Sequence, residues 1–513
     1  MIREAGILLS VTGLPSKYGI GCFDKAAYDF VDWLEQAGQS YWQILPLGAS
    51  SHCGSYDSPY QSYSAFAGNP YFISLDALVE EGVLTVEEVT SADFGSDPGR
   101  VDYDLLHKNR LPLLRKAYER SHVTTIQGYV DFTRENHWWL EDYALFMAVK
   151  NFFGDQGWMH WPEDIRMHYG YALDYYREKL YFDIEFHKYM QYKFFEQWSK
   201  LKVYANSKHI RIVGDIPIYV SPDGSDVWAH PELFQLDEAH LSTRVAGCPP
   251  DDFSADGQIW GNPLYRWDYH RQQNYHWWVT RMWYSFQLYD VVRIDHFRGF
   301  DEYFSIPADS TSALDGRWEK GPGMELFREL ERQLGKRSVI AEDLGFMTQG
   351  VRDLVRNSGY PNMKVLQFGF DLNDTYGTGD HLVHNFNNNC VVYTGTHDNE
   401  TLTGWLLGLS KEEQELVRTY IGQERLAVKK LPRKLIDLAM CSAARICIVP
   451  LQDWMGLDNS ARMNTPGTVG NNWAWRLQPA QLPEGLEQEI FTATCRYNRI
   501  NWQALQNRKT DKA

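Results

Sequence analysis

The sequence predicts an α/β protein built on a (β/α)8 TIM barrel, with large insertions after strands 2 and 3 at the C-terminal face. Eight short apolar runs recur along the chain, and helical stretches lie between them. The chain has 513 residues, whereas a plain barrel takes about 250. A doubly wound sheet more often has about five or six strands, so eight runs favour the barrel.

The predicted strands are aliphatic or β-branched on both faces, as parallel strands covered by helices are. They are 6–10, 41–45, 211–216, 291–295, 338–342, 364–368, 390–394 and 446–450. Between them, 24–38 predicts a helix that begins at an aspartate cap and ends at glycine. The segment 185–201 repeats apolar residues at every fourth position, which predicts a helix whose apolar face packs in the core rather than binding a ligand.

Two gaps between predicted strands are too long for a loop and one helix. We therefore expect the barrel to comprise 1–47, 206–217 and 289–513. The insertion 48–205 should be a helical subdomain whose last helix returns to the barrel, and 218–288 should form a cleft wall. Both leave from C-terminal strand ends, the catalytic face of such barrels.

Composition restricts the partners. The net charge is -17, and an acidic surface repels phosphates, which argues against nucleic acid and anionic membranes. A neutral ligand is not penalised. Aromatic residues make up 15% of the chain, with 19 Trp. Many of these rings pack the core, and the rest can stack on flat apolar faces such as those of sugars.

The cysteines indicate a cytoplasmic protein. Their number, 7, is odd, and none form a C-x-x-C pair, so we expect reduced thiols rather than disulfides or a zinc site. The N-terminal segment resembles a signal peptide only faintly, because Glu4 interrupts its basic region and no small-residue cleavage site follows. No stretch is long and apolar enough for a membrane span.

Four carboxylates follow or end predicted strands. Asp215 ends the third, Asp295 the fourth and Glu342 the fifth, and Asp398 follows the seventh. Each alone could be a structural ion pair or a helix cap. Because the C-terminal ends of barrel strands meet at one rim, we expect all four to converge there, where like charges raise a proton affinity and can create a general acid.

Two carboxylates with separated pKa values are what glycosidic bond chemistry requires. Arg293 lies two residues before Asp295 in a strand, so both point the same way, and its charge should keep Asp295 ionised. Apolar neighbours should raise the pKa of Glu342 and suit it as the acid. His296 and His397 flank two of the carboxylates and can donate hydrogen bonds to hydroxyl groups, although a lone histidine is more often a packing residue.

These segments resemble a known family. RIDHFRGF, AEDLG and GTHDNE are similar to strand signatures of the α-amylase clan. DSPYQSYSAFAGNPYFISL, GDIPIYV, GCPPDDFSADGQIWGNPLY and RMNTPGT resemble more specifically the 4-α-glucanotransferases, also called amylomaltases or disproportionating enzymes. The resemblance runs from residue 6 to about residue 475. It implies transfer of α-1,4-glucan segments between maltodextrins of starch or glycogen metabolism, with glucose as an acceptor.

The resemblance assigns roles at matching positions. Asp295 would be the nucleophile, Glu342 the general acid/base, and Asp398 the group that holds the hydroxyls of the distorted sugar. The implied substrate contacts are Ser58, Tyr60, Asp215, Trp260, Asn262, Arg293, His296, Asp371, His397 and Asn464. Tyr60 and Trp260 could instead only pack the insertions onto the barrel.

No cofactor or metal is expected, because no Walker motif, no G-x-G-x-x-G after a strand and no H-E-x-x-H is found. One alternative function is an α-1,4-glucan hydrolase of the same clan, an α-amylase or α-glucosidase, which shares the first half-reaction. A catalytically dead glucan-binding barrel is another, but it would have lost a rim carboxylate. A retaining enzyme should hold the carboxyl groups of Asp295 and Glu342 roughly 5–5.5 Å apart.

Overall fold

The computed structural model describes the chain apart from residues 1, 51–56, 251–255, 346, 373–377 and 506–513. Its centre is a closed barrel of eight parallel strands in the order β1-β12-β11-β10-β9-β6-β3-β2. These strands are β1 (Glu4–Leu8), β2 (Tyr41–Gln43), β3 (Arg211–Ile216), β6 (Val291–Ile294), β9 (Val339–Ala341), β10 (Asn362–Val365), β11 (Cys390–Tyr393) and β12 (Ile446–Pro450). All eight predicted strands are confirmed, with ends that differ by a few residues.

Side chains alternate between the inside of the barrel and the helices around it, as the strand period of two requires. One buried cluster fills the interior and draws residues from all eight strands. It includes Leu8, Tyr41, Val213, Val291, Ile340, Met363, Val391 and Ile448. The neighbouring strand positions, such as Trp42 and Ile212, belong to a larger cluster beneath the helices. Burial on both faces explains why the strands are mainly apolar.

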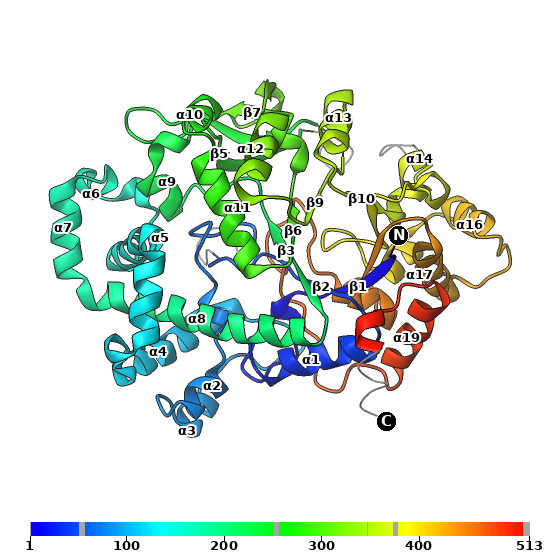
Figure 1. Cartoon of the computed structure of the whole chain (residues 1–513), viewed down its shortest axis with the longest axis horizontal. Coiled ribbons are helices and arrows are strands. Elements are labelled where there is room, and N and C mark those ends of the chain that lie inside the picture. Colours follow the sequence, from blue (N-terminus) through cyan, green and yellow to red (C-terminus); the bar gives the residue numbers. More distant parts are fainter. Residues whose placement is uncertain (1, 51–56, 251–255, 346, 373–377, 506–513) are drawn as a thin grey trace.

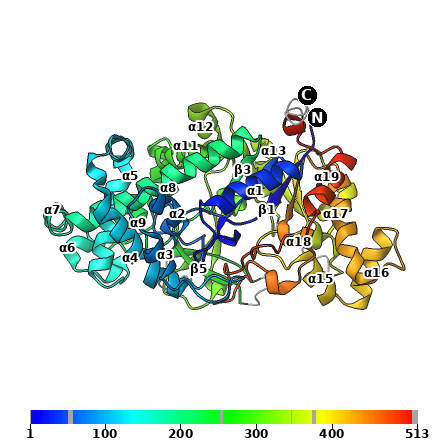
Figure 2. The same cartoon turned by 90° about the horizontal axis from the view of Figure 1, so that it is seen from below.

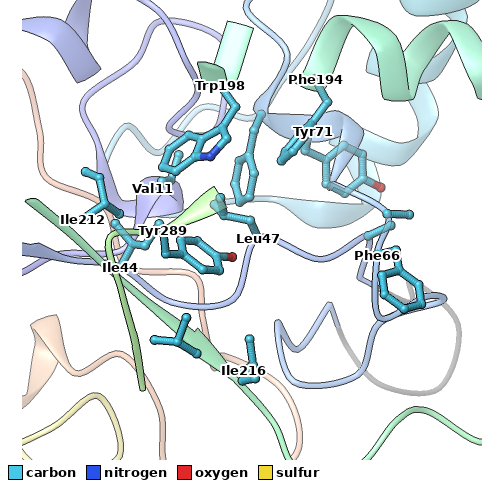
Figure 3. Packing of buried hydrophobic residues seen from close by; sticks show 14 of the residues in the cluster. Val11, Ile44, Leu47, Phe66, Tyr71, Phe194, Trp198, Ile212, Ile216 and Tyr289 are labelled. Atoms are coloured by element: carbon cyan, nitrogen blue, oxygen red, sulfur yellow. The ribbon is translucent and has the colours of Figure 1, made fainter. Parts of the chain in front are cut away.

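The segment between β2 and β3 is helical and extends to one side of the barrel (Figure 1). It contains α2 (Leu75–Glu80), α3 (Val86–Thr90), α4 (Tyr103–Ser121), α5 (Gln127–Phe152), α6 (Glu163–Arg166), α7 (Gly170–Lys179) and α8 (Tyr181–Ser207). Helix α8 returns to β3. Figure 3 shows Phe194 and Trp198 of α8 packed close to Leu47 and Tyr289. The apolar face predicted for 185–201 is buried, so its assignment to the core is confirmed.

The segment between β3 and β6 contains α9 (Ser225–Ala229), β4 (Arg244–Cys248), β5 (Gln258–Pro263), α10 (Trp267–Gln272) and α11 (His276–Leu288). Its two strands belong to a four-stranded antiparallel sheet of order β5-β4-β7-β8. Strands β7 (Glu302–Pro307) and β8 (Arg317–Lys320) come from the next segment, between β6 and β9. This sheet is not predictable from the sequence pattern, because its short strands lack the apolar runs of the barrel strands.

The remaining helices follow the order of a (β/α)8 barrel, and Figure 2 shows several of them around the strands. They are α1 (Lys25–Gln36), α12 (Met324–Leu334), α13 (Gln349–Ser358), α14 (Thr378–His381), α15 (Leu402–Gly408), α16 (Lys411–Tyr420), α17 (Leu431–Cys441), α18 (Leu451–Met455) and α19 (Leu486–Arg496). The predicted aspartate cap is Asp24, whose side chain accepts a hydrogen bond from the backbone of Ala26. Within the described residues, no helix is both long and apolar enough to cross a membrane.

Candidate active site

Four carboxylates lie at the C-terminal ends of barrel strands, as predicted. Asp215 lies within β3 one residue before its end, Asp295 directly follows β6, and Glu342 directly follows β9. Asp398 lies in the loop between β11 and α15. Because these strands are parallel, the four residues lie at one rim of the barrel.

Arg293 joins two of the carboxylates. Its Nη1 atom lies 2.7 and 2.6 Å from the two carboxylate oxygens of Asp215, and its Nη2 atom lies 3.0 Å from Oδ1 of Asp295. The Asp215 and Arg293 side chains are buried, whereas that of Asp295 is 29% exposed. The guanidinium therefore orients Asp295 while part of the Asp295 side chain stays exposed.

Glu342 is held beside Asp295 by the backbone. Its Oε2 atom accepts a hydrogen bond of 2.7 Å from the N–H of His296, the residue that follows Asp295. Its Oε1 atom accepts another of 2.7 Å from the N–H of Leu344. Both oxygens are thus fixed by main-chain donors, and the carboxyl orientation does not depend on a flexible partner.

The two carboxyl groups have different proton affinities. Burial and then the charge of Asp295 raise the pKa of Glu342 to about 8. Burial raises the pKa of Asp295 to about 6, and Arg293 opposes that rise. At pH 7 Asp295 is therefore ionised while Glu342 keeps its proton, which is the separation that an acid and a nucleophile need.

The raised pKa of Glu342 confirms the prediction from its apolar neighbours. Arg293 lies beside Asp295 as predicted and lowers its pKa. Burial outweighs the guanidinium and raises the pKa to about 6, which still leaves the carboxylate ionised at pH 7. Two-residue spacing in a strand predicts which side chains point the same way, but not how deeply both are buried.

Asp398 has its own set of donors. Asn464 Nδ2 donates to its Oδ1 atom at 2.6 Å, and His397 Nε2 lies 3.3 Å from its Oδ2 atom. Burial would raise the pKa of Asp398, but His397 and Asn464 outweigh it and hold the pKa at about 2. The side chain is 45% exposed. An ionised and partly exposed carboxylate can therefore accept hydrogen bonds from hydroxyl groups.

Tyr60 connects the long β2–β3 segment to this rim. Its hydroxyl donates to Asp215 Oδ2 at 2.8 Å and lies 2.7 Å from His397 Nε2. The Tyr60 and His397 rings are stacked, with centroids 5.2 Å apart. Tyr60 is thus part of the rim network and does more than pack an insertion. Ser58 lies two residues earlier, where its hydroxyl accepts the Tyr60 N–H at 3.3 Å.

Trp260 and His296 lie together on another side of the rim. Trp260 is in β5, and its ring meets that of His296 edge to face at a centroid distance of 4.9 Å. His296 has a left-handed backbone with φ of 53°, a conformation in which histidine is enriched among non-glycine residues. Burial lowers the pKa of His296 to about 3, so its imidazole is neutral at pH 7.

Asn262 and Asp371 are two further predicted sugar contacts. The Asn262 side chain is buried, and its amide nitrogen donates to the Val220 carbonyl at 2.8 Å. This bond joins β5 to the residues that closely follow β3. Asp371 is half-buried at the end of the 3₁₀ helix Leu366–Phe370, which follows β10. Contacts of either residue with a sugar stay predictions.

Protein donors hold the rim carboxylates. Within the described ranges, no group of three or more His, Cys, Asp or Glu side chains could hold a metal ion. The donors to these carboxylates include Tyr60, Arg293, His397, Asn464 and backbone N–H groups. This set can position hydroxyl groups and move a proton.

The family of the chain follows from comparison with known proteins. A family model described as 4-alpha-glucanotransferase matches residues 9–482. The chain belongs to this family.

Individual relatives agree over nearly the full length. The 4-alpha-glucanotransferase of Streptococcus pneumoniae serotype 4 is 46% identical over 503 residues, which cover 97% of this chain and 98% of that protein. That of Thermus thermophilus is 44% identical, with 94% and 96% covered. An amylomaltase from Streptococcus agalactiae, solved in complex with acarbose, has a TM-score of 0.93 at 40% identity and covers 97% of this chain and 100% of that chain.

The chain is therefore an enzyme of the 4-alpha-glucanotransferase family, and the hydrolase alternative is not favoured.

Three residues of the site region were not predicted from the sequence. Arg462 donates to the Asp398 carbonyl at 2.8 Å, and the Trp473 ring lies 5.6 Å from that of Tyr60. Arg462 lies in the RMNTPG segment that also carries Asn464, so this motif could have identified Arg462 as a site residue. Trp473 lies in no such motif, and no sequence pattern placed it at the site.

The third unpredicted residue is Asp453 in α18. Its side chain is buried and accepts hydrogen bonds from the Thr394 hydroxyl at 2.6 Å and from the Leu402 N–H at 2.7 Å. Burial raises its pKa to about 6. Thr394 and Leu402 lie at the two ends of the loop that carries His397 and Asp398, so Asp453 fixes both ends of that loop.

Proposed function

We propose that this enzyme transfers α-1,4-glucan segments from a donor maltodextrin to the 4-hydroxyl of an acceptor glucan or of glucose, by a retaining double displacement. The observation that carries the mechanism is the pair of carboxyl groups at the rim. Glu342 accepts the N–H of His296, the residue that follows Asp295, and the charge of Asp295 together with burial raises the pKa of Glu342. Retaining glycoside chemistry requires one ionised and one protonated carboxyl group in one site.

In the first step, a carboxylate oxygen of Asp295 attacks the anomeric carbon while Glu342 gives its proton to the leaving glycosidic oxygen. The bond from the anomeric carbon to that oxygen breaks, and a covalent glucosyl-aspartate forms. In the second step, Glu342 takes the proton of the acceptor 4-hydroxyl, whose oxygen attacks the anomeric carbon and releases Asp295. Two inversions give overall retention.

The other rim residues would hold the sugar at the reacting centre. Asp398, kept ionised by His397 and Asn464, would accept hydroxyl hydrogen bonds and favour the positive charge that develops on the sugar ring. Asp215 and Arg293 would hold Asp295 in its attacking orientation. His296 stays neutral and can donate or accept a hydrogen bond at a sugar hydroxyl.

Transfer requires the acceptor to compete successfully with water. We propose that 48–205 and 218–288 act as the two insertions that wall the cleft, and that Ser58, Tyr60, Trp260, Asn262 and Asp371 contribute to sugar subsites. Closing the cleft around the intermediate excludes water and presents the acceptor hydroxyl in position. The hydrogen bond from Tyr60 to Asp215 supports this arrangement, because it joins 48–205 to the rim.

The decisive experiment is incubation with maltotriose followed by product analysis. Transfer predicts a ladder of longer maltodextrins together with glucose. Products that are all shorter than maltotriose would show hydrolysis and would overturn the proposal. Nuclear magnetic resonance of the first products should show the α-anomer, and a first product with β-configuration would overturn the retaining mechanism.

We also propose that the enzyme acts in the cytoplasm. Among the described cysteines, Cys22, Cys390, Cys441, Cys447 and Cys495 are free. Free thiols are typical of a reducing compartment. Cell fractionation with an antibody against the chain tests this, and recovery of the protein outside the cytoplasmic fraction would contradict it.

A further inference from the structure

A pocket lies outside the set of carboxylates at the catalytic rim. It has a volume of about 550 Å³ and is lined by residues of α5, α9, α10, α11 and α12, helices that lie to one side of the barrel strands (Figure 1). This volume is within the roughly 300–1,000 Å³ range of small-molecule sites. None of the catalytic residues proposed above line it.

Three partly exposed aromatic rings line this pocket: Trp138 of α5, Tyr269 of α10 and Trp277 of α11. Trp138 and Trp277 both pack edge to face on the buried ring of Phe66, at centroid distances of 4.8 and 6.1 Å. Rings supported in this way present apolar faces at little cost in side-chain entropy. The C–H face of a pyranose is flat and apolar, so it can stack on such a surface.

Polar groups stand beside the rings. His230 follows α9, with its Nε2 atom 3.9 Å from Asp142 and its Nδ1 atom 3.5 Å from Glu232. All three side chains are partly exposed, at 44%, 27% and 41%. Hydrogen bonding by Glu232 raises the pKa of His230 despite its burial. The carboxylates can accept hydrogen bonds from hydroxyl groups, and such charge-assisted bonds are among the stronger ones.

The lining carries two carboxylates beside a histidine. Asp142 and Glu232 flank His230, and the exposed Arg332 of the lining is already paired with Glu329, to which its Nε atom donates at 2.8 Å. The carboxylates disfavour a phosphate there. A neutral ligand with several hydroxyl groups matches the aromatic faces and the acceptors together.

The pocket shares part of its wall with the active site. Ser64 and Phe66 line it and also line a smaller cavity that reaches Tyr60 and Asp215. Asp226 accepts the Ala65 N–H at 2.7 Å. A ligand in the pocket would therefore contact the chain segment that leads from Tyr60.

We infer that this pocket binds the end of an α-glucan chain without acting on it, as a second maltooligosaccharide site that holds polymeric substrate near the cleft. The inference rests on the proposed function for its choice of sugar. The inference goes beyond the proposed function, because glucan transfer at the catalytic rim does not require a separate pocket with its own aromatic rings and hydrogen-bond acceptors.

The test uses the full-length Asp295→Ala variant, which should bind sugar without turning it over. Calorimetric titration with maltotetraose should show two classes of sites, and crystals soaked in the same sugar should hold it beside Trp138 as well as in the cleft. Trp138→Ala in this background should weaken the second class at least tenfold, about the effect of 1.4 kcal/mol. Trp283→Ala is the matched control, because Trp283 is 44% exposed on the same α11 helix as Trp277 but does not line the pocket.

Glu232→Leu is a second variant in case Trp138→Ala fails to fold, and it should also weaken the second class. One class of sites in the Asp295→Ala protein, with no sugar beside Trp138 in the crystal, would overturn the inference. Maltotriose disproportionation by the wild type separates the two proposals. A product ladder with an empty pocket refutes the pocket alone, whereas sugar in the pocket without a ladder refutes the transfer mechanism alone.

Discussion

Replacing Glu342 by glutamine tests its role as the acid, since the amide has nearly the same shape but no acidic proton. The two carboxyl oxygens accept the N–H groups of His296 and Leu344, both at 2.7 Å. An amide has one acceptor oxygen, so one of these N–H groups loses its partner. The cost is about 1–3 kcal/mol of folding free energy, small enough for the variant to fold.

The catalytic effect should be much larger. General acid catalysis contributes about 10²–10⁴-fold in rate, so kcat with maltotriose should fall by that factor. In the wild type, kcat/KM should rise as Asp295 ionises near pH 6 and fall as Glu342 loses its proton near pH 8, with a maximum near pH 7. Glu342→Gln should lose the alkaline limb and keep the acid limb.

The assay compares two donors across this pH range. With α-maltosyl fluoride, the leaving fluoride needs no proton, so fluoride release in the first turnover should be much less impaired in Glu342→Gln than cleavage of maltotriose. An alkaline limb that persists in the variant would refute the assignment of that limb to Glu342. An equal loss with both donors would refute its role as the proton donor.

Three further substitutions test the site. Asp295→Ala should abolish transfer while circular dichroism and thermal unfolding stay near wild type, and near-normal turnover would rule out Asp295 as the nucleophile. Asp215→Ala leaves the buried guanidinium of Arg293 with one partner fewer, so urea unfolding should show a loss of about 3–5 kcal/mol; an unchanged midpoint would contradict the buried ion pair. Asp453→Asn keeps one of two acceptors for the loop that carries Asp398, so kcat should fall more than tenfold with KM little changed, whereas a rise in KM at constant kcat would contradict a positioning role.

The barrel could be predicted because its strands are simple. The barrel strands are buried on both faces, which gives mainly apolar runs, and a polar residue near the C-terminal end of such a run marks the rim. Asp295 and Glu342 are conspicuous for this reason. The antiparallel sheet gave no such signal, because β7 and β8 are short and mix polar with apolar residues.

Other parts of the site depend on distances that the sequence does not contain. Asp453 lies far along the chain from Thr394, and only the closed barrel brings α18 next to the loop after β11. The direction of the Asp295 pKa shift depends on how completely burial removes water from a group that also has a cationic neighbour. Local sequence identifies the neighbour but not the extent of burial.

The antiparallel sheet has a consequence for engineering. Strand β4, from the segment after β3, pairs with β7, from the segment after β6, the strand that precedes Asp295. If only one of these segments were replaced by that of another enzyme, a strand edge could be left unpaired, and unpaired edges favour aggregation. Chimeras intended to alter product size should therefore exchange 218–320 as one cassette.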